Sequence, residues 1–385
     1  MQTIKNFLYI FTFHEIKRVI LLTVMILIMA LLEIIGVVSI LPFIAVLTNP
    51  SLIQTNSILN SMFNVSIIFG VEDDQDFLFI LGVLVFATLV ISLSFKAFTT
   101  YAQHRFVQMR EYTIGKRLVE SYLRQPYSWF LNRNSSDLGK NVLSEIQAII
   151  GNGLNPLIEL LAKGIVAIAI IFLLIIVDYK LALFVGLILG GAYSLIFYIL
   201  RNFLKHIGEL RLSSNKYRFS ILSEAFGAIK EIKVKSLEKI YINRFADPAK
   251  SYAKTTALSQ IVKHLPRFFL EAIAFGGAML LILYLMVKKG NFNDALPIIA
   301  LYIFAGYRLI PSLQQIYNSL TQITFINPSL NYLVKDLKTL NEIKSNENKE
   351  SILFNKQISL NNIQYSYPNS SKLSTVRPSE KPHSS

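Results

Sequence analysis

The chain has 385 residues, a formal net charge of +14 and no cysteine, and 53% of its residues are hydrophobic. This apolar share exceeds the ~45–50% that is usual for soluble domains, and the mean hydropathy is +0.47. The composition therefore excludes an ordinary soluble protein. The lack of cysteine excludes disulfides, thiolate metal sites and cysteine nucleophiles.

Six apolar segments are each long enough to cross a membrane as a helix, which takes roughly 20 residues at a rise of about 1.5 Å each. Pro42 lies in the first segment and predicts a kink or an interfacial turn there. We predict an all-α membrane protein with six transmembrane helices, residues 1–330 forming its membrane domain. The segments lie near 19–47, 77–95, 157–177, 181–200, 268–287 and 295–316.

The charge distribution predicts the orientation of these helices. Segment 48–76 has no Lys or Arg, whereas 101–154 has seven and 201–263 has thirteen. Basic segments remain on the cytoplasmic side, so we expect both termini to be cytoplasmic. The basic residues alternate with acidic ones without an aromatic platform, so membrane lipid is the expected partner and nucleic acid is not. The five histidines show no ligand spacing, and no metal site is predicted.

The first long cytoplasmic segment predicts a helical hairpin. Between Lys96 and Gln125 the helix should continue beyond the membrane, because Gly115 is the only breaker there. Pro126 should end the helix, and 126–133 should form a short amphipathic segment at the tip. Its expected contact residues are Pro126, Tyr127, Trp129 and Phe130. For Trp129 we favour a hydrophobic anchor into a partner domain over packing within the molecule.

The second cytoplasmic segment repeats this plan. Residues 201–247 have a helical pattern, Pro248 should interrupt it, and a return helix should run to Pro266. The tip is predicted at 236–245, with one apolar face formed by Leu237, Ile240, Tyr241 and Phe245.

Ionisable residues within the spans are candidates for a substrate cavity, because a charge in hydrocarbon is costly unless it faces a partner or water. Arg308 either grips an anion such as a diphosphate, or snorkels, or pairs with Glu33 or Glu271. Glu33 is either a polar contact of the cavity or half of an interhelical pair. Lys96 is either an interfacial anchor or part of an anionic substrate path.

Other residues of the spans predict packing and no function. Glu159 and Lys163 are four residues apart and predict an ion pair within one helix. Two groups of small residues predict close approach of neighbouring helices, namely Gly186, Gly190 and Gly191, and Gly276 and Gly277.

The C-terminal part reads as a linker at 331–356, the first strand of a further domain at 357–370, and a disordered tail at 371–385. The strand contains Tyr365 and, before a proline, Tyr367. Eighteen residues follow Tyr367 and none is glycine, so no G-x-x-x-x-G-K-[ST] phosphate-binding loop follows. We therefore expect a domain that is truncated after its first strand.

Six spans, two long hairpins with short tip segments and the strand Ile-Ser-Leu-Asn-Asn-Ile-Gln-Tyr-Ser-Tyr-Pro resemble a type IV ABC exporter subunit. The resemblance implies that both tips are coupling helices that seat in nucleotide-binding domains. It also implies that Tyr367 stacks on adenine, whereas Tyr365 packs. ATP with Mg²⁺ is expected for an intact family member; this chain alone should bind neither and hydrolyse no ATP. The implied partners are a second subunit, identical or not, and a nucleotide-binding domain in trans.

Residues 227–233 and 305–317 are similar to flippases of lipid-linked oligosaccharides and to bacterial polysaccharide exporters. This narrower resemblance implies a bacterial inner-membrane protein that moves an amphipathic, lipid-linked saccharide outward. Two alternatives are a non-catalytic membrane partner of an intact ABC subunit and a non-functional truncated product.

Overall fold

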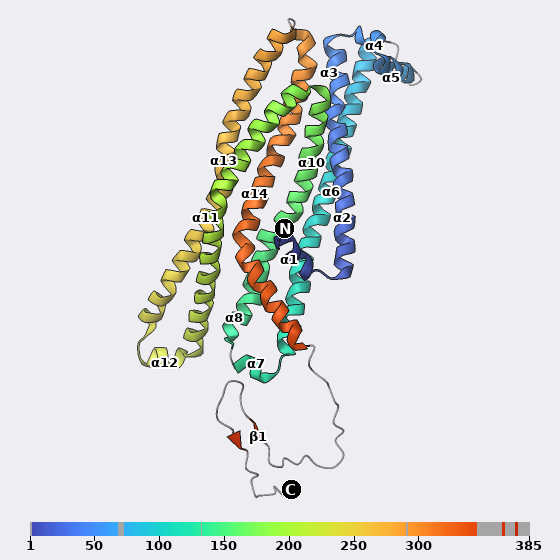
Figure 1. Cartoon of the computed structure of the whole chain (residues 1–385). Helices are drawn as coiled ribbons and strands as arrows, with labels where there is room; N and C mark the ends of the chain where they lie inside the picture. Colours follow the sequence, from blue (N-terminus) through green and yellow to red (C-terminus); the bar gives the residue numbers. More distant parts are fainter. Residues whose placement is uncertain are drawn as a thin grey trace, which may run out of the picture.

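The computed structural model describes residues 2–67, 73–131, 133–289, 292–344, 364–365 and 374–375. These residues form a long helical bundle (Figure 1). The predicted fold class, an all-α membrane domain, is confirmed. Among the described residues, three helical stretches are long and apolar enough to cross a membrane: His14–Thr48, Asp74–Leu123 and Ser135–Val177.

The N-terminal half begins with a short helix and continues into the first two spans. Thr12 precedes α2, and its N–H donates to Glu15 Oε2 at 2.7 Å, which satisfies a backbone donor at the helix start. A break at Ser39 divides the first span, and Pro42 lies in the first turn of the second part, where its missing N–H costs little. The elements are α1 (Gln2–Ile10), α2 (Phe13–Val38), α3 (Ile40–Thr48), α4 (Leu52–Thr55), α5 (Ser57–Ile67) and α6 (Asp74–Leu123).

The first hairpin turns at α7 and returns through a segment that is not uniformly α-helical. Pro126 follows the end of α6, as predicted, because the residue before a proline disfavours the helical conformation. Two five-residue π-helical stretches interrupt the return. The elements are α7 (Tyr127–Leu131), α8 (Ser135–Lys140), η1 (Asn141–Glu145), α9 (Ile146–Ile149), η2 (Ile150–Leu154) and α10 (Asn155–Val177).

The second hairpin differs from the prediction. The descending helix α11 (Tyr179–Gly227) ends at a glycine, and the short helix at the lower end of the hairpin is α12 (Ile229–Val234) (Figure 1). The return helix α13 (Glu238–Lys289) then runs through both Pro248 and Pro266. Pro248 therefore does not interrupt it. The last helix, α14 (Phe292–Lys344), extends from the upper to the lower end of the bundle (Figure 1).

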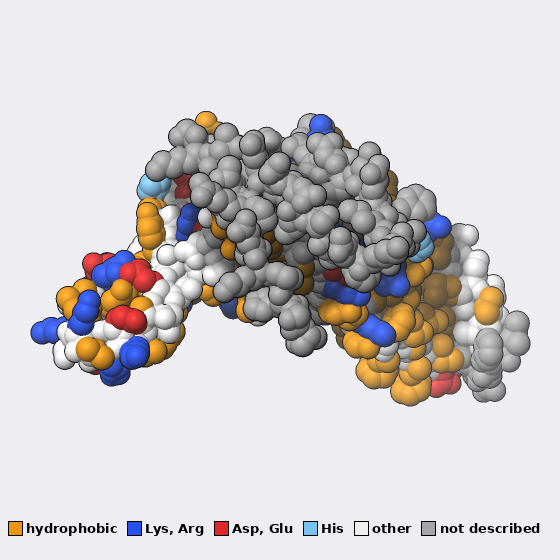
Figure 2. Space-filling view, turned by 90° about the horizontal axis from the view of Figure 1, so that it is seen from below, with side chains coloured by type: hydrophobic (Ala, Val, Ile, Leu, Met, Phe, Trp, Pro, Cys, Tyr) orange, Lys and Arg blue, Asp and Glu red, His pale blue; other side chains and the backbone are white. Residues whose placement is uncertain are grey.

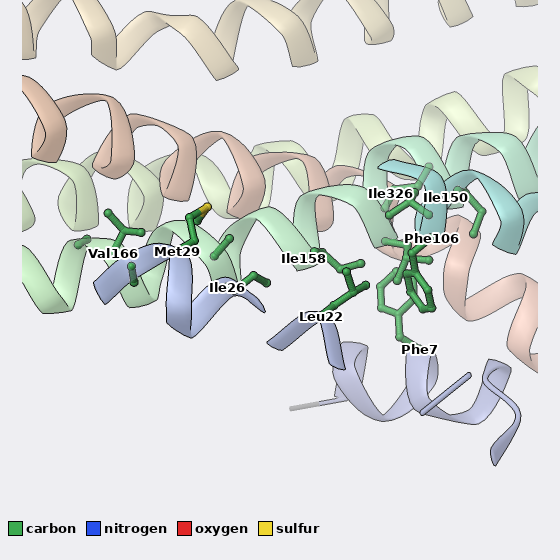
Figure 3. Close-up of a cluster of buried hydrophobic side chains, with 14 of the residues drawn as sticks. Phe7, Leu22, Ile26, Met29, Phe106, Ile150, Ile158, Val166 and Ile326 are labelled. Carbon is green, nitrogen blue, oxygen red and sulfur yellow. The ribbon is translucent and has the colours of Figure 1, made fainter. Parts of the chain in front are cut away.

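The main core lies where α1 joins the bundle. Phe7 of α1 points toward Phe106, Ile150 and Ile326, which come from α6, η2 and α14 (Figure 3). A Cβ at Gly153 would meet Phe7 Cζ at 2.8 Å, so the ring occupies the space that this glycine leaves. Apolar side chains of α2 and α10 continue this core along the spans.

The two strands are short. β1 (Gln364–Tyr365) pairs antiparallel with β2 (Ser374–Thr375). Ser374 and Thr375 belong to the segment expected to be disordered, and these two residues are paired instead. Tyr367 lies outside the described residues.

The helices are not parallel along the whole bundle. α11 and α13 pack against each other and against α14. Toward the lower end this pair diverges from the column formed by α6, α8 and α14, so that the tips α7 and α12 lie apart (Figure 1).

Candidate functional site

Three ionisable residues predicted to line a substrate cavity come together between three spans. Glu33 of α2 is 2% exposed, and its Oε1 lies 2.8 Å from Lys96 Nζ of α6 and 3.7 Å from Arg308 Nη1 of α14. Glu33 therefore forms an interhelical ion pair, which was one of its two predicted roles. The side chain of Glu271, the other partner considered for Arg308, is not among those described.

Two further charges belong to this region. Glu159 of α10 accepts hydrogen bonds from Asn155 Nδ2 at 3.1 Å and from the nearby Nε2 of Gln315 on α14. The predicted ion pair between Glu159 and Lys163 is therefore replaced by a contact between helices. Lys163 lies within electrostatic range of Lys96, Glu33, Glu159 and Arg308.

We call these five residues the intramembrane charge cluster: Glu33, Lys96, Glu159, Lys163 and Arg308. It contains three cations and two carboxylates, and both carboxylates already have close partners. The Lys96 side chain is 37% exposed and the Arg308 side chain 15%. Sequence reasoning missed Lys163 because its neighbour at i−4 looked like a sufficient partner.

The first tip has one exposed aromatic side chain and one that packs inward. Tyr127 is 74% exposed. Trp129 was expected to anchor in a partner domain, but its ring lies 5.6 Å from that of Tyr122 and 4.5 Å from the Arg133 guanidinium. Pro126 is also exposed, and Phe130 stacks edge-on against Trp129 at 5.0 Å between ring centroids.

An aspartate of α14 fixes this tip. Asp336 accepts hydrogen bonds from Tyr122 Oη and from Arg133 Nη1, both at 2.6 Å. Burial, and then the adjacent Asp336 carboxylate, raise the pKa of Tyr122, so its hydroxyl remains a donor. The tip is thus tied to the lower end of α14. Sequence reasoning missed this contact, because Tyr122 and Asp336 are 214 residues apart along the chain.

The second tip lies earlier in the chain than predicted. Leu237 is in the turn, and Ile240, Tyr241 and Phe245 lie in the first turns of α13. Ser236 has φ 55°, a left-handed conformation that favours glycine. Leu237 N–H donates to Ile232 O at 3.0 Å across this turn, which closes the end of α12 in the manner of a Schellman motif. This local geometry, rather than Pro248, sets the tip.

A charged contact joins the two helices of this hairpin near its tip. Both oxygens of Glu224 on α11 accept from the guanidinium of Arg244 on α13, at 3.0 and 3.1 Å, and Tyr241 Oη donates at 2.8 Å. The hydrogen bond from Arg244, and then that from Tyr241, lower the pKa of Glu224. Seen from below, acidic, basic and apolar side chains all appear on this tip (Figure 2).

The arrangement is that of a helical membrane domain with charged residues between its spans and two tips that project from one end. A family model for the ABC transporter transmembrane region matches residues 38–305, more than half of the chain. The chain therefore belongs to this family. It is a membrane protein, and its part in the family is that of a transporter's membrane subunit.

Proposed function

We propose that the chain is the membrane part of an ATP-driven exporter that moves an amphipathic anion across a bacterial plasma membrane, from the inner to the outer side. The observation that carries this proposal is the intramembrane charge cluster. It holds one cation more than carboxylates, and two of its cations keep some exposed surface. An anionic headgroup would balance this excess charge.

A phosphate or diphosphate suits this cluster chemically. A guanidinium binds phosphate oxygens through two parallel hydrogen bonds, and an ammonium adds a compact charge. In our proposal Glu33 compensates Lys96 and Arg308 when no substrate is bound, while Lys163 supplies the charge that has no close carboxylate among the described residues. The saccharide and the outward direction are supported only by the resemblance of residues 227–233 and 305–317 to flippases.

The energy would come from ATP and Mg²⁺ bound to nucleotide-binding domains that contact both tips in a dimer, identical or mixed. Pro126 and Tyr127 at the first tip, and α12 at the second, present exposed side chains to such a partner. In this arrangement both termini are cytoplasmic.

The substrate class is tested with the full chain in lipid nanodiscs. The probes are a fluorescent prenyl diphosphate and the matching prenyl alcohol, and fluorescence anisotropy gives the two dissociation constants. We expect the diphosphate to bind at least about tenfold more tightly, because charge-assisted hydrogen bonds contribute about 1.5–3 kcal/mol each.

Arg308→Ala and Lys163→Ala should each remove most of this preference for the diphosphate. Lys205→Ala is the matched control, since Lys205 is an exposed cation on α11 that pairs only loosely with Glu209 at 4.0 Å. Equal binding of diphosphate and alcohol would contradict an anionic substrate. A preference that survives both substitutions would place the anion elsewhere.

A further inference from the structure

A second charged network joins η1 and α14 to α11 of the second hairpin. Glu145 of η1 accepts from Arg211 Nη1 at 2.8 Å and from Asn215 Nδ2 at 2.7 Å, both donors on α11. Arg211 Nη1 also donates to Ser329 Oγ of α14 at 2.9 Å. All four residues are buried. We call Glu145, Arg211, Asn215 and Ser329 the Arg211 network.

A close approach of α11 to α14 lies beside this network. A Cβ at Gly208 would meet Phe325 O at 2.2 Å, so only glycine permits this contact. Gly208 is three residues before Arg211, and Phe325 is four residues before Ser329, about one helical turn in each case. Further along α11, Lys216 Nζ lies 3.4 Å from Asp137 Oδ2 of α8, and beyond these contacts the tips α7 and α12 lie apart (Figure 1). The network is therefore one of the contacts that join the second hairpin to the bundle before the tips separate.

The position of Glu145 depends on the π-helical geometry of η1. The N–H of Ile146, which follows Glu145, bonds to Asn141 O, five residues back, as in a π-helix. A change to α-helical bonding would rotate Glu145 by about 100° about the helix axis relative to the preceding turn, the angle of one residue. Such a rotation would carry its carboxylate away from Arg211.

We propose that the Arg211 network is a conformational switch that holds the α11–α13 hairpin against the rest of the bundle, and that a change of η1 from π to α geometry releases it. A buried ion pair adds little net stability compared with apolar packing, whereas separating its partners exposes an uncompensated charge. The network is therefore suited to selecting one of two arrangements. Displacement of α7 and α8, which lead directly into η1, would be the trigger.

The test measures the distance between the two tips in the full chain in nanodiscs. Because the chain has no cysteine, Tyr127→Cys and Val234→Cys introduce the only two labelling sites, and both positions are well exposed, at 74% and 77%. Spin labels there give a distance distribution. Glu145→Gln should raise the population of a separated state at least about tenfold over the parent, because the ion pair is lost.

Glu209→Gln is the matched control, since Glu209 lies on α11 two residues from Arg211 but is exposed. It should leave the distribution unchanged. Deleting Leu143, an exposed residue of η1, removes the extra residue of the π turn and should produce the same separated state as Glu145→Gln. If Glu145→Gln cannot be purified folded, Asn215→Leu removes one donor and should give the same separation.

Thermal unfolding of the same samples distinguishes a switch from a merely structural contact. Glu145→Gln with a lower unfolding temperature but the parent's distance distribution would overturn the proposal. An unchanged distribution after deletion of Leu143 would overturn the role given to η1.

Discussion

At the scale of single residues, the stability of the spans should depend strongly on Glu33, because two cations from different helices share its Oε1. Glu33→Gln should destabilise the folded chain by about 1–3 kcal/mol. Breaking a buried ion pair costs about 3–5 kcal/mol, and the cost should be smaller here because solvent screens Lys96, which is more than a third exposed. The measurement is the free energy of unfolding in mild detergent.

The control for Glu33→Gln is Glu120→Gln on α6, where the carboxylate is exposed and lies 4.0 Å from Lys116. This change should stay within about 0.5 kcal/mol of the parent. Equal stability of the two variants would mean that the intramembrane cations do not need Glu33.

Ser236 is the residue with a strained backbone at the second tip. Ser236→Gly should stabilise the turn by about 1 kcal/mol, because a side chain in the left-handed region costs about 1–2 kcal/mol that glycine avoids. Amide hydrogen exchange at Leu237, whose N–H bonds across the turn, should slow about fivefold.

Ser213→Gly is a control for which the opposite effect on stability is expected. Ser213 is solvent-exposed and lies in the middle of α11, where the backbone is helical. There glycine should destabilise the helix by about 0.5–1 kcal/mol. Faster exchange at Leu237 in Ser236→Gly would show that the serine side chain, rather than the backbone geometry, supports the turn.

At the scale of elements, the packing of α11 on α14 depends on one glycine. Gly208→Ala should cost about 2 kcal/mol or more, because its Cβ would lie 2.2 Å from Phe325 O and the helices would have to separate. Thermal unfolding in detergent measures this loss. At Gly191 of the same helix no described atom lies within 4 Å of a built Cβ, so Gly191→Ala should be neutral or stabilising.

This pair of glycines also corrects the sequence reading. Gly186, Gly190, Gly191, Gly276 and Gly277 were predicted to permit close helix approach, yet no atom of a described neighbour lies within 4 Å of a Cβ built at any of them. The close approaches occur at Gly153 and Gly208. The positions of the glycines in the sequence identify candidates for close packing. A glycine permits close packing only where its face of the helix meets a neighbouring element.

The contact between α11 and α13 should depend on pH. Because Arg244 lowers the pKa of Glu224 below its ordinary value of 4.5, the contact contributes stability above pH 4.5 and loses it as the pH falls through the lowered pKa. The mobility of a spin label at Val234→Cys should therefore rise below pH 4.5. Glu238 also has a lowered pKa, owing to a backbone hydrogen bond at the start of α13 and to Lys233.

Substitutions distinguish the contribution of Glu224 to this pH dependence from that of Glu238. In Glu224→Gln the label should already be more mobile at pH 7, and only the smaller change due to Glu238 should remain. The double variant Glu224→Gln, Glu238→Gln should show no change between pH 6 and 3. A parent-like pH profile in the double variant would exclude this contact as the cause.

At the scale of the whole molecule, the charge distribution predicts which end faces the cytoplasm. Asn64→Cys on α5 should react with a membrane-impermeant maleimide on intact cells, whereas Val234→Cys near α12 should react only after permeabilisation. The reason is that segment 48–76 carries no Lys or Arg, while 201–263 carries thirteen. The reverse pattern of labelling would invert the proposed direction of transport.

The sequence by itself determined the helical spans, the excess of positive charge at one end and the turn at Pro126. These follow from hydrophobic length, from charge counts and from the restricted backbone before proline, which are properties of neighbouring residues. The family resemblance had the same basis, and the match over residues 38–305 agrees with it.

Only the tertiary structure decided which charges meet. Glu159 pairs with Gln315 instead of Lys163, Trp129 packs against Tyr122, and Glu145 binds Arg211 across two hairpins. It also placed the second tip at α12 and carried α13 through Pro248. Sequence spacing fixes neighbours within one helix, whereas these contacts depend on which faces of distant helices the packing brings together.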